Sequence, residues 1–357
     1  MPWDERKLAT QRRSSLATEK GLRLISMSER CLAEQDRAQL SEAMYDMSKL
    51  RSQKREIARK GLLRSLFSLA WKCTAVLLLL LSLAALNNNY SLRRIPRADF
   101  CARLDRSVEA STNWMYGHPE ILGNPSLMFM VADMEKMSGD PRLRQMLDQY
   151  RRSKYVTDPL RPFGVFGPVW ARMVDPQAPV PMIDMTQVVP DQGLPEILWD
   201  AYAVVPDRVA ISYAQRVNMF SPTKYYWGKR HHQLLALVMY RYYNGGSEEL
   251  NRTINYLAEK VARDAHFDFR VSDSYVQRNA FILGAGRTDL IRSRWIERVL
   301  DYQRPDGSWA YCWYSWCRGI LEFRLGDVGP DHSTVQAAWA LYMLKYRFPQ
   351  WIEQHYR

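Results

Sequence analysis

Two short segments near the C-terminus constrain the fold more than any other part of the sequence. Residues 303–309 are Gln-Arg-Pro-Asp-Gly-Ser-Trp, and residues 331–341 are Asp-His-Ser-Thr-Val-Gln-Ala-Ala-Trp-Ala-Leu. The first segment predicts a helix end followed by a tight Asp-Gly turn that an aromatic residue closes. The second predicts the start of a helix whose small side chains allow close packing. Together they indicate a fold built from helical hairpins.

These segments resemble one repeat of the toroids of terpene cyclases and protein prenyltransferase β-subunits, in which a Gln-x-x-Asp-Gly-Ser-Trp turn joins an outer helix to an inner one. The resemblance covers this one repeat and implies an all-α fold, an α/α toroid of helical hairpins. It speaks to the fold rather than to a reaction. The Asp-x-Asp-Asp proton donor of the cyclases has no counterpart in this sequence, and the cyclases need two toroids where this chain supplies one.

The rest of the C-terminal part repeats a pattern typical of such hairpins. An apolar, small-residue helix meets a Gly-containing turn, and an amphipathic charged helix follows. Glycine adopts positive φ easily and therefore often ends the first helix. The pattern occurs at 127–152, 232–262 and 274–303, and a last inner helix is expected at 333–346. The sequence thus predicts one toroid domain over residues 87–357.

A proline-rich segment interrupts this pattern. Eight of the 18 prolines fall between residues 159 and 195. Helices do not continue through such a density of proline, so we expect a long irregular excursion over one face of the domain. A functional lid or partner surface and a structural belt over an incomplete toroid are equally good interpretations.

Residues 65–86 (SLFSLAWKCTAVLLLLLSLAAL) are strongly apolar, with Lys72 as their only charge. Their length matches the ~20 residues that a bilayer requires, and Lys72 lies near one end, where it can reach the headgroups. The segment predicts a transmembrane helix, and a buried helix of a soluble protein is the alternative. Basic residues are denser before the segment than after it, so we expect a cytoplasmic N-terminus. The C-terminal domain would then lie in the periplasm or in a secretory lumen.

The N-terminal part, residues 1–64, is charged and has no glycine or proline between residues 22 and 60. Apolar residues recur there at roughly helical spacing: Leu32, Leu40, Met44, Met47, Leu50 and Ile57. This pattern predicts a long amphipathic helix from about residue 28 to residue 64 that can pair with a partner helix of a membrane complex. A solvated, partly disordered arm is the alternative.

The formal net charge of +12 is divided evenly between the parts before and after residue 66. A dedicated nucleic-acid tail would concentrate the charge, and no zinc-finger, helix-turn-helix or RNA-binding motif occurs. We therefore expect no nucleic-acid partner. A basic surface suits an anionic partner such as a phospholipid surface or an acidic polymer, and ordinary solubility explains it equally simply.

In an α/α toroid, the residues before and at the start of each inner helix gather at one mouth of the barrel. Three clusters of chemically capable residues occupy such positions in this chain. Histidine titrates near neutral pH, tyrosine can act as an acid, and arginine can bind a carboxylate or a phosphate through two hydrogen bonds. The predicted catalytic residues are His231, His232, Asp273, Tyr275, Arg278, Asp331 and His332.

Aromatic residues near the same mouth can form stacking walls for sugar rings or isoprenoid chains. A glutamine one turn into the last inner helix can add hydrogen bonds. The predicted substrate-binding residues are Tyr226, Trp227, Trp309, Trp313, Trp316 and Gln336. For each single residue of both sets, a helix cap or a packed core side chain is the alternative interpretation.

The sequence predicts no cofactor, with zinc as a minor alternative. The possible zinc ligands are His231, His232, His332 and Asp331, with Cys312 or Cys317. The prenyltransferase resemblance implies an Asp-Cys-His zinc set, but Asp306 and Cys312 stand six residues apart where that family has two. No Cys-x-x-Cys pair occurs among the five cysteines. For Cys312 and Cys317, a disulfide across a loop and two unpaired thiols both remain open.

The expected function is that of a single-pass membrane protein whose extracytoplasmic toroid binds or acts on an envelope or secreted carbohydrate, either an acidic polymer or a lipid-linked glycan. A hydrolase needs two carboxylates, for which Asp273 and Asp331 are the candidates, with Glu322 in reserve. A lyase would use His231 or His232 together with Tyr275 and Arg278, and an epimerase is a further possibility.

Two other classes of function remain open. The domain can be a non-catalytic scaffold of a membrane-bound synthesis or secretion complex, with the N-terminal helix as its docking element. Alternatively, it can bind or transform an isoprenoid lipid. A water-filled pocket with His232, Tyr275, Arg278 and His332 favours the glycan enzyme, whereas a deep aromatic tunnel without paired acids favours the lipid.

Overall fold

The computed structural model describes residues 5–357, apart from residues 92, 161–163, 188–194, 223–228, 269, 311, 318–320 and 325–329. Side chains are described from residue 44 onward, with further gaps at 46, 57–58, 195 and 312–330. The chain divides into two compact units, residues 1–79 and residues 80–357. Most of the described residues are helical and few lie in strands, which agrees with the all-α prediction.

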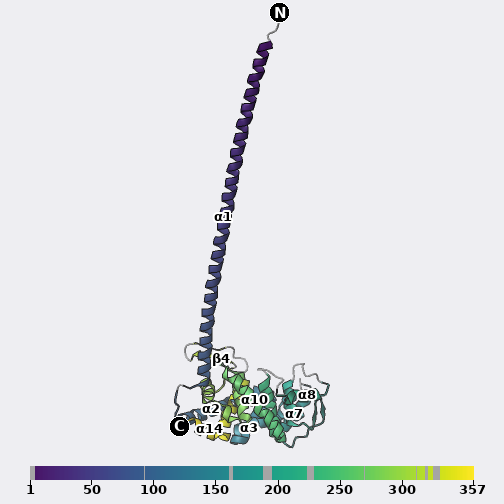
Figure 1. Ribbon diagram of the computed structural model, residues 1–357. Helices are drawn as coiled ribbons and strands as arrows, with labels where there is room; N and C mark the ends of the chain where they lie inside the picture. The colour runs from purple at the N-terminus through teal and green to yellow at the C-terminus, as the bar shows by residue number, and fades with distance from the viewer. Residues whose placement is uncertain are drawn as a thin grey trace. The chain divides into compact units, whose positions relative to one another are not determined.

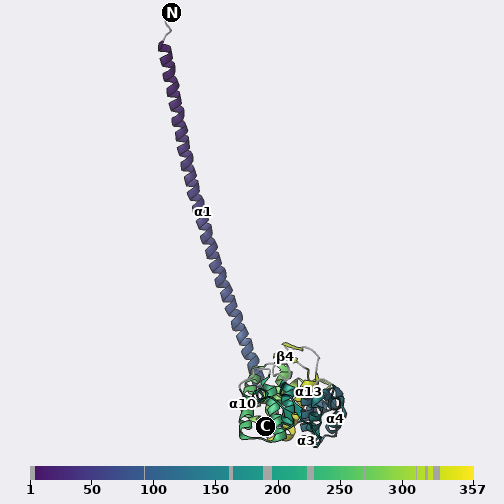
Figure 2. The ribbon, with the colours of Figure 1, turned by 90° about the vertical axis from the view of Figure 1, so that its right-hand side faces the viewer.

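One uninterrupted helix, α1 (Glu5–Asn89), makes up the first unit and continues into the second (Figures 1 and 2). Among the described residues, one stretch of it, Met47–Asn89, is long and apolar enough to cross a membrane by length and composition. The most apolar 18-residue window of this stretch has a mean hydropathy of 2.1, and only 6% of that window is buried. The predicted apolar segment therefore lies in a helix whose side chains are largely exposed.

The second unit is a bundle of short helices with two small sheets. Its α-helices are α2 (Arg97–Tyr116), α3 (Pro125–Ser138), α4 (Pro141–Arg152), α5 (Lys154–Thr157), α6 (Gly167–Val174), α7 (Pro195–Val204), α8 (Tyr213–Phe220), α9 (Arg230–Asn244), α10 (Glu248–His266), α11 (Asp273–Gly284), α12 (Ser293–Asp301), α13 (Pro330–Tyr342) and α14 (Pro349–His355). Short 3-10 or π turns are η1 (Pro119–Gly123), η2 (Gly164–Phe166), η3 (Thr288–Leu290) and η4 (Met343–Arg347). The strands are β1 (Ile183–Asp184), β2 (Val209–Ala210), β3 (Arg270–Ser272), β4 (Cys312–Cys317) and β5 (Leu321–Arg324).

Three helical hairpins are organised around glycines with positive φ. Gly139 (φ 68°) separates α3 from α4, Gly245 (φ 81°) separates α9 from α10, and Gly286 (φ 82°) follows α11 before α12. In the first two hairpins the next helix is capped by a side chain, because Asp140 and Ser247 accept hydrogen bonds from its first backbone N–H groups. The helices predicted around these turns are present.

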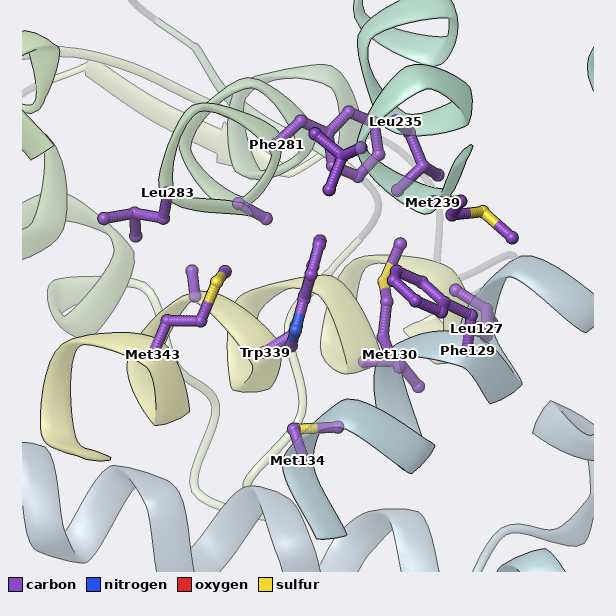
Figure 3. Packing of buried hydrophobic residues seen from close by; sticks show 14 of the residues in the cluster. Leu127, Phe129, Met130, Met134, Leu235, Met239, Phe281, Leu283, Trp339 and Met343 are labelled. Atoms are coloured by element: carbon purple, nitrogen blue, oxygen red, sulfur yellow. The ribbon is translucent and has the colours of Figure 1, made fainter. Parts of the chain in front are cut away.

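Helix α13 lies at the centre of the core and packs against α2, α3 and α11. All its side chains from residue 333 to residue 342 are buried, as expected for a helix without a charged face. Figure 3 shows Trp339 between Phe129 and Phe281, and the ring centroids are 5.7 and 6.3 Å away. The indole Nε1 donates a hydrogen bond to the buried carboxylate of Asp133 at 2.8 Å.

The antiparallel sheet of β3, β4 and β5 departs from the purely helical expectation. Strand β4 has the sequence CWYSWC, and its aromatic residues favour extended backbone. A strand rises about 3.3 Å per residue, so the Cα atoms of Cys312 and Cys317 at its two ends lie about 15 Å apart. A disulfide cannot span that distance. The strand therefore excludes the bridge between Cys312 and Cys317 that was one of the two open alternatives.

The proline-rich segment at 159–195 is not irregular throughout. It contains η2 and α6, and its strand β1 pairs in parallel with β2. Helix α6 begins at Gly167 with Pro168 directly after it, where proline removes no intrahelical hydrogen bond. A dense set of prolines is thus compatible with a helix when one of them occupies the first turn.

The turn at 303–309 holds α2, α12 and α13 together. Gln303 Nε2 donates to the carbonyl oxygens of Gly307 and of Ser107 in α2, both at 3.0 Å. The backbone N–H of Trp309 donates to Thr334 Oγ1 of α13 at 2.9 Å, and the Trp309 side chain is buried. These contacts explain why the turn carries this sequence.

We expect Gly307→Ala to destabilise the protein far more than Gly139→Ala. Both glycines have positive φ, at 92° and 68°. A Cβ at Gly307 would lie 2.3 Å from the backbone oxygen of Ala110 in α2, whereas a Cβ at Gly139 meets nothing within 4 Å. Gly139→Ala should cost about 1 kcal/mol, and Gly307→Ala about 3 kcal/mol or more. Chemical denaturation of both variants measures the difference, and equal costs would contradict the close approach of the turn to α2.

The C-terminal end of α1 is held tightly within the second unit. The Asn88 side chain is fully buried; its Nδ2 donates to the carbonyl oxygen of His266 at 3.2 Å and its Oδ1 accepts from Arg298. Asn89 Nδ2 donates to the same carbonyl at 2.8 Å, and Asn89 Oδ1 accepts from Trp295 Nε1 at 3.2 Å. Helices α10 and α12 therefore fix the last turn of α1.

Candidate functional site

The first turns of α11 and α13 bring Asp273 and His332 together. Ser272 caps α11 by accepting a hydrogen bond from the backbone N–H of Tyr275, so Asp273 is the first residue of that helix. Pro330 opens α13, and its restricted φ suits a helix start. Because α11 and α13 pack against each other, residues distant in the sequence meet at these two helix starts.

The Asp273 carboxylate is the hydrogen-bond acceptor at the centre of this cluster. His332 Nδ1 lies 2.8 Å from Asp273 Oδ1, and Ser333 Oγ donates to the same oxygen at 3.3 Å. Gln277 Nε2 donates to Asp273 Oδ2 at 2.9 Å. An ionised carboxylate only accepts, so the Asp273 contact places a proton on His332 Nδ1. In the neutral imidazole, Nε2 then carries the lone pair that a general base needs.

Gln336, one turn further along α13, contacts that second nitrogen. Its Nε2 lies 3.2 Å from His332 Nε2 and can donate to the lone pair. The Gln336 side chain is buried, and among the described residues its Oε1 has no hydrogen-bond partner. A buried amide oxygen without a partner is costly, so it marks a position where a ligand hydroxyl can donate.

A pocket of about 290 Å³ opens beside these residues. This volume is at the lower end of ligand sites and suits about one sugar ring. Its polar lining comes from α13, from α9 through His232, from α7, and from the start of α3 through Asn124 and Ser126. The residues that line it are Gly123, Asn124, Pro125, Ser126, Trp170, Glu196, Ile197, Asp200, His232, Leu235, Phe281, His332 and Gln336.

Asp200 is the most perturbed carboxyl group in this pocket. Burial raises its pKa to about 7, the hydrogen bond from Ser126 Oγ opposes that rise, and the charge of Glu196 adds to it. Near neutral pH a large fraction of Asp200 is therefore protonated. A carboxylic acid that keeps its proton at neutral pH is what a general acid requires.

The two histidines of the pocket differ in their protonation. Burial lowers the pKa of His232, and the charges of Glu196 and Asp273 offset this only in part. Burial also disfavours charge on His332, but the hydrogen bond and the charge of Asp273 outweigh it and raise the His332 pKa. His232 thus stays neutral as a hydrogen-bonding group, whereas His332 is the stronger base.

Of the predicted catalytic residues, His232 and His332 line this pocket, and Asp273 is connected to it through its contact with His332. Arg278 and Tyr275 do not line it. The guanidinium group of Arg278 forms a buried ion pair with Asp268. The Tyr275 ring is fully buried with the Arg298 guanidinium 5.1 Å from its centroid, and burial raises the Tyr275 pKa to about 12.

Asp331 and His231 border the cluster. Asp331 directly precedes His332, and its charge contributes to the raised His332 pKa. The His231 ring is buried, and its centroid lies 4.5 Å from that of the His232 ring. Neither of the two residues lines the pocket.

The structure describes the side chain of only one of the five predicted aromatic binding residues, Trp309. Trp309 lies in the core, where its Nε1 donates to the carbonyl oxygen of Val299 at 2.7 Å, so it packs rather than lines the pocket. Trp313 and Trp316 belong to β4, and their side chains lie outside the described part. Tyr226 and Trp227 lie outside the described residues altogether.

Two acids that α7 contributes to the pocket were not predicted from the sequence. Glu196 and Asp200 stand four residues apart in an otherwise apolar helix, PEILWDAYAV, so they lie on one face of it. Two carboxyl groups in a segment of that composition are a usable signal, because buried acids are rare unless they have a specific role.

Zinc was the minor alternative. Among the residues with described side chains, no group of three His, Cys, Asp or Glu residues is arranged to hold a metal ion. The side chains of Cys312 and Cys317 lie outside this set. Of the proposed ligands that are described, His332 uses Nδ1 to contact Asp273.

No protein-family model matches this chain, and no curated protein or solved structure matches it either.

Proposed function

We propose that this chain is a single-pass membrane protein whose extracytoplasmic C-terminal domain, an α/α toroid, acts on an acidic carbohydrate by acid–base chemistry. The observation that carries the proposal is the His332–Asp273 pair beside a pocket that also contains Asp200, a carboxyl group with a pKa of about 7. Such chemistry needs a base and an acid, and here they are a histidine that Asp273 orients and a carboxyl group that keeps much of its proton near neutral pH.

The reaction that suits these groups best is β-elimination from a uronate-containing chain. His332 Nε2 removes the proton from the carbon next to the sugar carboxylate. The electron pair of that C–H bond forms a C=C bond, the C–O bond to the leaving sugar breaks, and Asp200 gives its proton to the departing oxygen. An epimerase would share this proton removal, but the C–O bond would stay intact and a proton would return to the same carbon from the opposite face.

The other groups of the pocket can hold the sugar. Neutral His232 and the Gln336 amide offer hydrogen bonds without adding negative charge. Gln336 Oε1, which has no partner within the described part of the chain, accepts a hydrogen bond from a sugar hydroxyl. The basic composition, with a net charge of +12, favours the approach of an anionic polymer.

A second, open groove of about 760 Å³ supports the carbohydrate assignment. Its lining includes Tyr202, Phe220 and Tyr240, and the Tyr240 ring contacts the Tyr202 and Phe220 rings with centroids 6.1 and 5.3 Å apart. Arg216 also lines the groove. Aromatic faces next to a cation suit the rings and the carboxylates of an acidic glycan.

The proposed membrane anchor and the proposed toroid are each supported by a different feature of the structure. The apolar segment at 65–86 lies within the stretch of α1 that is long and apolar enough to span a bilayer. Several of its leucines are exposed, and more than half of the residue surface is accessible at Leu77, Leu78 and Leu79. The hairpins around the central helix α13 are the units from which a toroid is built.

A scaffold function is the second candidate, and one observation favours it. Helix α1 exposes Met44, Tyr45, Met47 and Leu50 within the first unit, each at more than half of its surface. Exposed apolar residues at helical spacing suit a partner helix. The isoprenoid alternative is less favoured, because the pocket beside His332 carries two carboxyl groups.

The test is an activity screen of the full chain in detergent on polygalacturonate, alginate, hyaluronan and a neutral glucan. We expect depolymerisation of at least one acidic polymer and none of the neutral one. An unsaturated product that absorbs ultraviolet light identifies a lyase, and new reducing ends without that absorbance identify a hydrolase. Absence of activity on every polymer, with α1 still retaining membrane partners, would favour the scaffold.

A further inference from the structure

A polar pocket of about 330 Å³, separate from the site beside His332, lies between the start of α2 and α12. Four arginines line it together with three acidic residues and one isoleucine. The lining residues are Arg93, Ile95, Asp99, Arg103, Arg106, Arg294, Glu297 and Asp301. We call it the arginine pocket.

The acids do not neutralise all four arginines. Arg103 Nη2 pairs with Asp301 at 2.7 Å, and Arg294 Nη1 lies 3.5 Å from both Asp301 and Glu297. Arg93 and Arg106 are exposed, and neither forms an ion pair with another residue whose side chain is described. Among the residues with described side chains, these two guanidinium groups thus have no acidic partner. Guanidinium groups recognise phosphate oxygens by paired hydrogen bonds.

The position of the arginine pocket suggests where such a phosphate comes from. Arg294 Nε donates to the backbone oxygen of Asn87 at 3.0 Å, and its Nη2 lies 3.3 Å from Asn87 Oδ1. Asn87 directly follows the apolar segment at 65–86. One side chain of the pocket thus touches the residue at which the proposed membrane span ends.

The last turns of α1 in the second unit have two different faces. Ala84 and Asn88 are buried against the domain. Leu83 and Leu86 remain about half exposed, at 49% and 54%. Exposed leucines beside a basic pocket suit a molecule with an apolar tail and an anionic head.

We propose that the arginine pocket binds the phosphate of an anionic phospholipid, whose acyl chains lie along Leu83 and Leu86. The proposal rests on the proposed membrane span and is independent of the glycan chemistry. Arg93 and Arg106 supply the cations, while Arg294 connects the pocket to the end of the span. The volume of about 330 Å³ accommodates a phosphate with a small polar head.

The test is native mass spectrometry of the full chain in detergent, after incubation with phosphatidylglycerol or phosphatidylcholine of identical acyl chains. We expect the wild-type chain to retain phosphatidylglycerol about fivefold more than phosphatidylcholine, and the Arg93→Gln/Arg106→Gln variant to lose that preference. Arg94→Gln/Arg152→Gln is the matched control, because it removes the same charge from exposed arginines that do not line the pocket. The control should keep the preference.

Three results would overturn the proposal. The first is equal retention of the two lipids by the wild-type chain, and the second is an unchanged preference in Arg93→Gln/Arg106→Gln. The third is binding of glycerol phosphate as tight as that of the lipid, which would assign the pocket to a soluble anion. An alkaline wash of membranes that carry the full chain tests the membrane span separately from the lipid site. Release of the chain would overturn both the span and the lipid site. Retention of the chain without a lipid preference would overturn the lipid site alone. The glycan screen is unaffected by either.

Discussion

We expect His332→Ala to lower kcat/KM by about 10³-fold on the acidic glycan that the wild-type chain degrades fastest. The variant removes Nε2, the proposed base, from a helix start that is otherwise well packed. His332 is partly exposed beside the pocket, so its loss should change the melting temperature little compared with its effect on rate. Steady-state kinetics on the purified full chain measure the loss.

Asp273→Asn tests whether Asp273 orients His332 for catalysis or only stabilises the structure. The hydrogen bond and charge of Asp273 raise the His332 pKa above its ordinary value against the effect of burial, so His332 loses its proton and becomes a base at a higher pH than an ordinary histidine. Without that carboxylate the His332 pKa falls, and the acid limb of the kcat/KM profile should move to lower pH. The rate itself should also fall, because the asparagine no longer fixes the proton on Nδ1.

His355→Ala is the matched control for both variants. His355 contacts the carbonyl oxygen of Trp351 at 2.8 Å in α14 and does not line the pocket. It should leave both the rate and the pH profile unchanged. Wild-type activity in a folded His332→Ala variant would contradict the proposed base, and an unmoved acid limb in Asp273→Asn would reduce that residue to a structural contact.

The helical part of the fold follows from local signals in the sequence. Gly139 and Gly245 end apolar helices in the positive-φ region, and the residues around them already predict a hairpin. Strand β4 is different, because it forms by pairing with a segment some 40 residues earlier, with Arg270 opposite Tyr314. Such long-range pairing leaves little local trace, so the CWYSWC sequence alone did not separate a strand from a loop.

The part of the candidate site that lies at helix starts could be predicted from the sequence, because helix starts themselves carry sequence signals. Asp273 and His332 both lie in the first turn of a helix, and the packing of α11 against α13 brings them together. Arg278 follows Asp273 at the expected distance, yet a buried guanidinium requires a carboxylate and takes Asp268. Asp200 enters through the packing of α7 against α9, which no sequence motif reveals.

We expect Asp200→Asn to stabilise the protein and to weaken catalysis. The folded-state pKa of Asp200 is about 7, above its ordinary 3.8, so stability is greatest below pH 3.8 and is lost as pH rises toward 7. Asparagine does not ionise and avoids this loss. The gain over wild type should grow between those two pH values and reach up to about 4 kcal/mol above pH 7. Denaturant unfolding of both chains across this range measures it.

Ser126→Ala provides the paired test with the opposite sign. The Ser126 hydroxyl donates to Asp200 and lowers its pKa, so its removal raises that pKa further and should reduce stability at neutral pH. The double variant Asp200→Asn/Ser126→Ala should lose this pH dependence, because the titrating group is gone. If Asp200→Asn instead destabilises by the same amount at every pH, Asp200 is ionised in the folded protein. The pocket would then lack the acid that the proposed elimination requires, even if His332 proves to be essential.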